Sequence, residues 1–230
     1  MIVTIDGPAG AGKSSVSRRL AEQLGFAFLD TGAMYRCVTL YCLRNGIELD
    51  DRLAVSQIAQ TINIRMTDDA VWVDNEDVTT AIRSIEVTRA IKKVADNPQA
   101  RQSLVESQRQ WASSRDVVTE GRDQGTVAFP HAECKIFLTA TSEERARRRV
   151  GQLEQNGVSA NYQEILSLQN QRDLEDTSRE VGGLKRAADS IEVWTDGMTE
   201  DEVLAKLVSI VKTAQRQMPE KSFRALGCES

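Results

Sequence analysis

A glycine-rich loop between a predicted strand and a predicted helix constrains this chain more than any other feature. Residues 2–5 form a short apolar run with β-branched side chains, which is typical of a buried strand. Residues 14–24 carry apolar side chains at helical spacing, and Gly25 suits the end of a helix. Between them, Gly7-Pro8-Ala9-Gly10-Ala11-Gly12-Lys13-Ser14 matches the pattern G-x-x-x-x-G-K-[ST] at every place.

A loop of this kind binds phosphate. Its glycines let successive backbone N–H groups point inward at phosphate oxygens, and the following helix adds its positive N-terminal end. We expect Lys13 to reach the β- and γ-phosphates of a nucleoside triphosphate and the Ser14 hydroxyl to ligate Mg²⁺. The predicted triphosphate-binding residues in the loop are Gly7, Pro8, Ala9, Gly10, Ala11, Gly12, Lys13, Ser14 and Ser15.

Strands and helices alternate along the rest of the chain, which predicts an α/β fold with a parallel sheet flanked by helices. Further strands are expected at 26–29, 117–119, 135–138 and 190–193, and helices at 32–45, 84–95, 98–113, 161–176 and 199–218. Another, Arg-rich helix opens at Thr141 with a capping box. Between residues 62 and 78, apolar residues alternate around a polar turn, which predicts a hairpin beside the sheet.

Composition excludes several classes of protein. The chain has 230 residues, of which 40% are hydrophobic and 27% charged, as is ordinary for a globular domain. Its formal net charge of −5 argues against a protein that coats nucleic acid. The single histidine, His131, excludes a metal site built from several histidines.

The cysteines and the apolar stretches of the sequence indicate the cellular compartment in which the protein works. Cys37, Cys42, Cys134 and Cys228 form no C-x-x-C pair, so we expect buried thiols in a reducing compartment. No signal peptide is visible, and no stretch approaches the roughly 20 apolar residues that span a bilayer. We therefore expect a cytoplasmic monomer with no nucleic-acid or membrane partner.

The remaining motifs narrow the class of triphosphate-binding protein. No asparagine is followed by lysine, so the N-K-x-D base-reading motif of a GTPase switch is missing. Motor and AAA-type ATPases normally need a longer chain. A small kinase remains, and its chemistry requires positive charge around both phosphoryl groups during transfer.

Several arginines could supply that charge. Arg36 lies where the second predicted strand runs into a helix, and Arg122 lies in a glycine-flanked loop after a buried strand, where α/β sheets bind ligands. Arg172, Asp176 and Arg179 share one helix face if the helix continues that far. A solvated salt-bridge ladder is the alternative interpretation of this last segment.

Four stretches form a set: Ile5-Asp6-Gly7-Pro8-Ala9-Gly10-Ala11-Gly12-Lys13-Ser14, Leu29-Asp30-Thr31-Gly32-Ala33-Met34-Tyr35-Arg36, Gly121-Arg122-Asp123-Gln124-Gly125-Thr126-Val127 with Phe129-Pro130, and Arg172-Asp173 through Asp176 to Arg179. The set resembles the bacterial cytidylate kinases, among the nucleoside monophosphate kinases, over nearly the whole chain. All P-loop kinases share the first stretch, whereas the second and third are specific to this family. The resemblance implies direct, Mg²⁺-dependent transfer of the ATP γ-phosphoryl group to CMP or dCMP, giving ADP and CDP or dCDP.

The resemblance also implies roles for individual residues. Lys13, Arg36, Arg122 and Arg172 would be catalytic, and Arg148 would contact ATP. The implied substrate-binding residues are Thr31, Arg36, Arg101, Arg122, Asp123, Arg172, Asp176 and Arg179. Of these, Thr31, Arg36 and Arg122 would hold the acceptor's phosphate. Arg172 and Asp176 would contact the sugar and orient the phosphoryl group during its transfer.

Arg101 and Asp123 would face the cytosine, with Arg179 nearby. Cytosine offers an N4 donor beside its N3 and O2 acceptors, so an aspartate can accept from N4 while an arginine donates to N3 and O2. A carboxylate is a poor partner for uracil, whose O4 is an acceptor. The pair would therefore favour CMP over UMP.

The family also implies a division of the chain. Residues 1–36 and 114–218 would form the P-loop core, and 37–113 the monophosphate-binding region with its hairpin insert at about 62–90. A short lid at about 148–162, beginning in the arginine run 145–149, would close over ATP and exclude water. A plain solvated helix face is the alternative for that run. Residues 219–230 would form a flexible tail.

Three positions depart from the family pattern. Lys92 stands where a serine that touches the base is usual. Gly182-Gly183-Leu184 replaces Ala-Pro-Leu, which predicts a looser backbone after Arg179. Glu120 stands where an aspartate is common, and either carboxylate could serve behind the Mg²⁺ through water.

Two rival functions stay open at this point. Lys92 favours a P-loop kinase for a different nucleoside monophosphate or small acceptor. The second rival is a nucleotide-dependent binding protein without catalytic activity. Such a protein would not need arginines that hold a second phosphate group. The sequence therefore predicts a cytidylate kinase.

Overall fold

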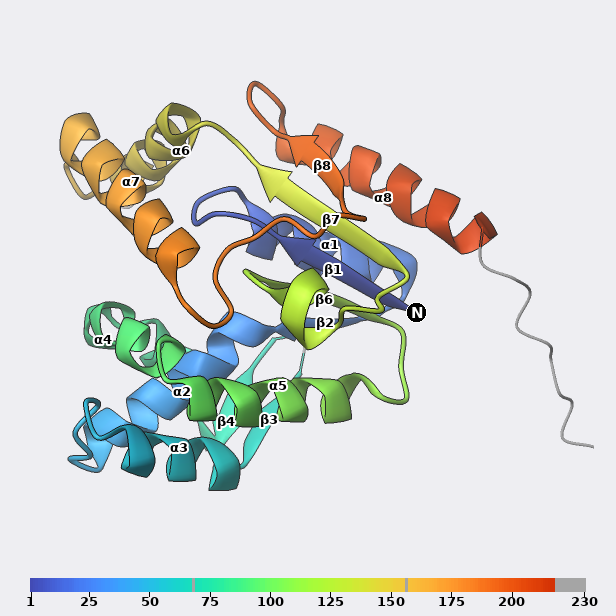
Figure 1. The fold of residues 1–230 in the computed structure, drawn as a ribbon. Helices are drawn as coiled ribbons and strands as arrows, with labels where there is room; N and C mark the ends of the chain where they lie inside the picture. The colour runs from blue at the N-terminus through green and yellow to red at the C-terminus, as the bar shows by residue number, and fades with distance from the viewer. Residues whose placement is uncertain (68, 156, 218–230) are drawn as a thin grey trace, which may run out of the picture.

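Five parallel strands form the centre of the computed structural model, which describes residues 1–67, 69–155 and 157–217. The sheet has the order β2-β6-β1-β7-β8, so β1 lies in its middle (Figure 1). Its strands are β1 Ile2–Asp6, β2 Ala27–Asp30, β6 Val117–Gly121, β7 Cys134–Thr139 and β8 Ile191–Trp194. Every neighbouring pair is parallel, which confirms the predicted α/β fold.

Eight helices accompany the sheet in the described residues. They are α1 Lys13–Leu24, α2 Thr31–Arg44, α3 Arg52–Thr61, α4 Ile85–Ala95, α5 Pro98–Ala112, α6 Ser142–Gln155, α7 Tyr162–Ser178 and α8 Glu200–Gln217. A 3-10 turn, η1 Ala81–Arg83, and a π-helical turn, η2 Gln124–Ala128, complete the helical elements. Figure 1 shows α8 on one side of the sheet and the α2, α3 and α5 group on the other.

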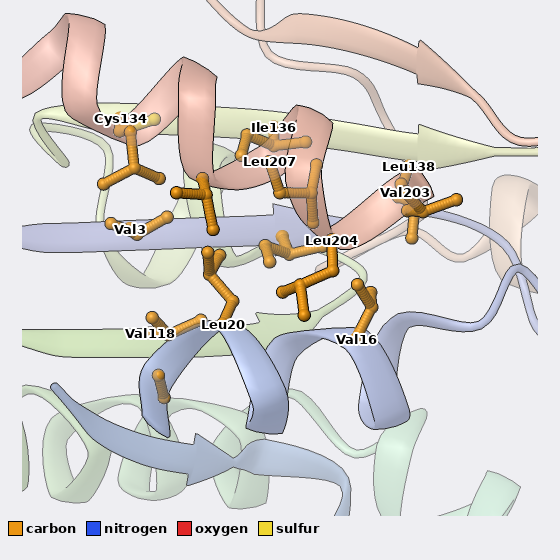
Figure 2. Packing of buried hydrophobic residues seen from close by; sticks show 14 of the residues in the cluster. Val3, Val16, Leu20, Val118, Cys134, Ile136, Leu138, Val203, Leu204 and Leu207 are labelled. Atoms are coloured by element: carbon orange, nitrogen blue, oxygen red, sulfur yellow. The ribbon is translucent and has the colours of Figure 1, made fainter. Parts of the chain in front are cut away.

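The first core lies between the sheet and the pair α1 and α8. Val16 and Leu20 of α1 lie one turn apart and meet Leu204 and Leu207 of α8 over the strands (Figure 2). Gly25 ends α1 in the left-handed conformation, with φ 69°. This packing fixes the helix that follows the glycine-rich loop against the strand that precedes it.

A second core lies on the opposite face, where α2, α3 and α5 pack against β6. The side chain of Asp30 caps α2 by accepting from the Ala33 N–H at 2.9 Å. Asn97 caps α5 in the same way, and Pro98 stands at its first turn as expected. The first cap places the start of α2 at the end of β2 in the central sheet.

The predicted hairpin is present and has a third strand. β3 Ile64–Met66 and β4 Val71–Val73 pair antiparallel, and β5 Glu76–Asp77 adds to β4. The sequence did not predict β5 because its two exposed acidic residues show no apolar alternation. The small sheet packs on α2 through buried residues such as Val71 and Val73.

One helix and the ends of two elements differ from the sequence predictions in ways that matter for the site. α3 was not predicted, because only Val55, Ser56 and Ala59 are buried on it. β6 runs on to Gly121 because its end pairs with that of β1. α7 ends at Ser178, so Arg179 lies beyond the helix face on which it was expected.

Three smaller expectations concern the whole chain. Cys37, Cys42 and Cys134 are free and buried, as predicted. None of the helices within residues 1–67, 69–155 and 157–217 is long and apolar enough to cross a membrane. The tail predicted for 219–230, with Cys228, lies outside the described residues.

Substituting Leu20 tests the first core. Its side chain is fully buried, so Leu20→Ala should lower the free energy of unfolding by about 2–5 kcal/mol through lost burial and an unfilled cavity. The control Leu53→Ala removes a side chain that is 69% exposed and should change stability by less than about 0.5 kcal/mol. Denaturant titration measures both, and equal losses in the two variants would contradict this packing.

Candidate active site

The carboxyl ends of the parallel strands gather the candidate residues at one edge of the sheet. β1 leads into the glycine-rich loop, β2 into Asp30 and Thr31, and β6 into Glu120 and the segment after it. Because parallel strands end at the same edge, loops far apart in sequence become neighbours there. The structure therefore brings the P-loop and the Arg122 loop together.

The P-loop is shaped by close backbone approach. Gly7 has φ 152°, and a Cβ atom there would lie 1.9 Å from the backbone oxygen of Leu138 on β7. Gly10 and Gly12 have φ 79° and 85°, in the left-handed region. The loop turns back over the end of the sheet and delivers the chain into α1, whose first N–H groups can face an anion.

Lys13 is held inside this loop. It is 5% exposed, and its Nζ donates to the backbone oxygen of Pro8 at 2.8 Å. Burial, together with the positive charge of Arg122, lowers the pKa of Lys13 to about 7. An anion bound in the loop would compensate this cationic environment.

The Ser14 hydroxyl and the Glu120 carboxylate provide two hard oxygen atoms beside the loop. Ser14 Oγ donates to Glu120 Oε1 at 2.6 Å. Within the part of the chain that the structure describes, no three His, Cys, Asp or Glu side chains gather into a metal site. The two oxygen atoms of Ser14 and Glu120 fit Mg²⁺, which binds through one or two protein groups and takes most ligands from phosphates and water.

Asp6, which sequence reasoning did not single out, ties two of these loops together. Its buried carboxylate accepts the backbone N–H groups of Gln124 at 2.8 Å and Gly125 at 2.7 Å. Burial raises the pKa of Asp6 to about 6, and these two hydrogen bonds oppose the rise. The signal in the sequence was an acidic residue directly after a buried apolar strand.

Arginines and acids from three segments meet around Asp176. Arg122 Nε donates to Asp176 at 2.7 Å, and Arg179 Nη2 donates to the same carboxylate at 3.2 Å. Arg179 also pairs with Asp96 at 2.6 Å. Burial opposes ionisation of Asp176, but the Arg122 charge and hydrogen bond outweigh it and hold its pKa below the usual range.

Arg172 lies in the same cluster and remains accessible to solvent. The surrounding protein lowers its pKa, and the charges of Arg122, Arg36 and Arg179 add to the effect. Of the salt-bridge ladder considered for Arg172, Asp176 and Arg179, the structure contains the Arg179–Asp176 pair, and Arg122 completes it in place of Arg172. Among the described residues, the side chain of Arg172 makes no hydrogen bond or ion pair, and its charge is felt by its neighbours.

Thr31 and Arg36 place the start of α2 against two other parts of the molecule. Thr31 Oγ1 donates to the backbone oxygen of Glu120 at 2.7 Å. Arg36 Nη1 donates to Ile82 O at 3.1 Å and Thr88 Oγ1 at 2.8 Å, both in the hairpin region. Arg36 therefore connects the insert to the cationic cluster.

Arg101 and Asp123 are brought together as a buried ion pair. They are 5% and 4% exposed, and Arg101 Nη2 donates to Asp123 Oδ2. The guanidinium carbon lies 5.3 Å from the centre of the Tyr35 ring. An arginine and a carboxylate thus lie side by side near the cationic cluster.

The arginines of the run 145–149 have different environments and contacts. Arg145 is 4% exposed and donates to Ala9 O at 3.1 Å and to Asp173 Oδ1 at 3.0 Å. It therefore fits neither a mobile lid nor a solvated face: it joins α6 and α7 to the P-loop. Arg148 donates to Thr195 Oγ1 at 3.0 Å, and its contact with ATP stays a prediction.

The structure shows the contacts made at two of the positions that depart from the family pattern. Lys92 pairs with Glu175 at 3.1 Å on the exposed side of α4. The loosening expected at Gly182-Gly183 stays a prediction, and both glycines lie in close contacts. A Cβ at Gly183 would lie 2.7 Å from Arg179 O, and one at Gly182 would collide with Arg101.

This arrangement suits two anionic groups held next to each other. The P-loop presents backbone N–H groups and Lys13 on one side, and the arginine cluster presents positive charge on the other. Arg122 lowers the pKa of both Lys13 and Arg172, so its charge acts on both sides. Such an arrangement can stabilise a phosphoryl group that passes between two phosphates.

Comparison with known proteins agrees with this reading. A sequence model of the cytidylate kinase family matches residues 3–213. The cytidylate kinase of Rhodopirellula baltica is 53% identical over 92% of this chain and 93% of its own length. That of Pelotomaculum thermopropionicum is 44% identical over 94% and 97%.

A solved structure supports the fold alone. An uncharacterized protein from Eubacterium ventriosum superposes with a TM-score of 0.51 at 11% identity, covering 93% of this chain and 99% of that one. The family, by contrast, rests on sequence that extends through the P-loop, the arginine cluster and the Arg101–Asp123 pair. The chain belongs to the cytidylate kinase family.

Proposed function

We propose that this chain transfers the γ-phosphoryl group of Mg²⁺-bound ATP to CMP or dCMP, releasing ADP and CDP or dCDP. The observation that carries the proposal is the position of Arg122, whose charge acts both on Lys13 of the P-loop and on Arg172 of the arginine cluster. A protein that only bound a triphosphate would have no use for a second cationic group beside it. Transfer between two phosphates requires both.

The P-loop, residues 7–15, holds the triphosphate through backbone N–H groups, and Lys13 compensates charge on the transferring group. Ser14 and Glu120 would hold Mg²⁺, which neutralises phosphate charge when bound. Arg148 lies on α6 next to Thr195, in the region proposed as a lid over ATP, about 148–162. Closure of that lid would exclude water from the reaction.

Thr31, Arg36 and Arg122 hold the acceptor's phosphate, and Arg172 stabilises charge that develops between the two substrates. An oxygen of the acceptor phosphate attacks the γ-phosphorus as the bond to the β-phosphate oxygen breaks. The acceptor is already an anion at neutral pH, so the chain needs no general base. Asp176 positions the arginines that perform this step.

Arg101 and Asp123 read the base. The Asp123 carboxylate can accept from N4 of cytosine, whereas O4 of uracil would face it as a second acceptor. An unpaired buried polar group costs roughly 1–3 kcal/mol, or about tenfold to a hundredfold in discrimination. The hairpin insert at about 62–90 closes the acceptor side through the Arg36 contacts.

We further propose that the enzyme acts as a monomer in the cytoplasm, without nucleic-acid or membrane partners. The formal net charge of −5 disfavours polyanion binding. Residues 1–36 and 114–218 would act as the core, and 37–113 as the acceptor-binding region.

The direct test offers each nucleoside monophosphate in turn with Mg²⁺ and ATP and measures ADP formation. We expect CMP and dCMP to exceed UMP, AMP and GMP by at least about tenfold in kcat/KM. Lys13→Ala should lower kcat by about a hundredfold or more with CMP, because it removes charge from the transferring group. Equal turnover of UMP and CMP would contradict the base assignment, and no turnover with any acceptor would favour a binding protein.

The lowered pKa of Lys13 predicts a pH dependence of ATP binding. Lys13 of the free enzyme loses its proton above about pH 7, and a bound triphosphate favours the protonated form. The affinity for Mg²⁺–ATP should therefore fall as pH rises from 7 to 9, by at most about tenfold per unit. Calorimetry in buffers of different ionisation enthalpy should detect proton uptake on binding at pH 8.

Lys13→Met is the matched control, because methionine has an unbranched side chain of similar length and no titrating group. Its affinity for Mg²⁺–ATP should be weaker and flat over the same range. An affinity of the unmodified enzyme that stays constant from pH 7 to 9, without proton uptake, would contradict the assignment.

A further inference from the structure

The guanidinium of Arg145 joins three parts of the chain beside the P-loop. Its Nε donates to the backbone oxygen of Ala140, directly after β7, at 3.0 Å, and its Nη1 donates to Ala9 O in the P-loop at 3.1 Å. It also forms a bidentate ion pair with Asp173 of α7, in which Nη1 donates to Oδ1 at 3.0 Å and Nη2 to Oδ2 at 2.5 Å. Such a planar fork fixes the orientation of its partner as well as the distance.

A second contact joins α7 to the P-loop one turn before Asp173. A Cβ atom at Gly10 would lie 2.9 Å from Nε2 of Gln169 and 3.4 Å from Cβ of Arg145. Gln169 and Asp173 are four residues apart, so they lie on one face of α7. Figure 1 shows α6 and α7 side by side, and the two helices pack on each other. This face of α7 is therefore held against the P-loop at two points.

The next turn of α7 contacts the arginine cluster. Asp176 is buried and accepts from Arg122 Nε at 2.7 Å and from Arg179 Nη2 at 3.2 Å. Asp173 and Asp176 are three residues apart, which is about 4.5 Å along the helix axis. One rigid helix therefore connects the P-loop to the arginines on the acceptor side.

Arg172 lies on α7 between Gln169 and Asp173. Among the described residues its side chain makes no hydrogen bond or ion pair, and it is accessible to solvent. The backbone of α7 therefore determines where Arg172 stands, and the Cα atom of Asp173 is only about 3.8 Å away. A shift of Asp173 against the P-loop would move Arg172 with it.

We propose that Asp173 is a positioning residue, which through its ion pair with Arg145 holds Arg172 at the place relative to the P-loop that phosphoryl transfer requires. This inference rests on the proposed function, in which Arg172 stabilises charge that develops between the two substrates. Both oxygens of the Asp173 carboxylate face Arg145, so Asp173 acts through these arginines and not on a substrate. Its loss should therefore affect the transfer step more than the binding of ATP.

The experiment compares Asp173→Asn with Glu175→Gln. Each variant removes one negative charge from α7 and keeps the shape of the side chain, but Glu175 pairs with Lys92 of α4 at 3.1 Å and not with Arg145. In Asp173→Asn we expect kcat with CMP to fall by about tenfold or more, because a misplaced group loses its effect on the transition state. KM for Mg²⁺–ATP should stay within about threefold, and Glu175→Gln should change kcat by less than about twofold.

A double-mutant cycle with Arg172→Ala tests the route of the effect. If Asp173 acts by placing Arg172, adding Asp173→Asn to Arg172→Ala should change kcat by less than about twofold. A role in the shape of the P-loop alone predicts the same loss in both backgrounds and a raised KM for Mg²⁺–ATP. That result would overturn the proposal.

A second variant keeps the test available if Asp173→Asn does not fold, since the substitution leaves the buried Arg145 without its counter-charge. Asp173→Glu keeps a carboxylate for Arg145 but places one more methylene between it and α7. We expect this variant to show a cooperative thermal melt and a kcat about fivefold lower than that of the unmodified enzyme. The loss should disappear in the Arg172→Ala background, and its persistence there would contradict the assigned role.

The unmodified enzyme separates this inference from the proposed function. If it forms no ADP with any acceptor, the proposed function fails and the role of Asp173 fails with it. If it phosphorylates CMP and Asp173→Asn keeps the full kcat, the inference about Asp173 alone is overturned.

Discussion

The site depends on one buried carboxylate at the end of the central strand. Asp6 accepts two backbone N–H groups from the segment after β6, and the P-loop begins at the next residue, Gly7. A buried charge without partners would be costly, so the segment after β6 must return to the end of β1. The P-loop and the Arg122 loop are therefore joined at one fixed point, at the end of the central strand.

Around this anchor, acids position the cations without neutralising the cluster. Asp176 holds Arg122 and Arg179, whereas Arg172 meets mostly like charge. Such crowding opposes folding, but it is relieved when anionic substrates arrive. Arg145 contributes to the same arrangement, because its guanidinium donates to the backbone oxygen of Ala9 in the P-loop. The cationic residues are thus arranged as the proposed binding of two phosphates requires.

Sequence patterns predicted the features that depend on local signals. The P-loop, the parallel strands and the hairpin follow from glycine spacing and apolar periodicity, and the structure contains all three. The convergence of Arg36, Arg122 and Arg172 came from family resemblance, because no local pattern encodes contacts between distant segments. For the same reason Asp6 was missed, and Arg145 was assigned to a lid rather than to the P-loop. The close approach of Gly182 to Arg101 was missed because the two residues are remote in the chain.

A crystal structure with a bisubstrate analogue, cytidine and adenosine joined through a phosphate chain, tests the central claim most directly. We predict that the phosphate chain runs from the P-loop and Lys13 to Arg122, Arg172 and Arg36, with the cytosine against Asp123. Phosphates that contact the P-loop alone, with the cytidine outside the arginine cluster, would contradict the account.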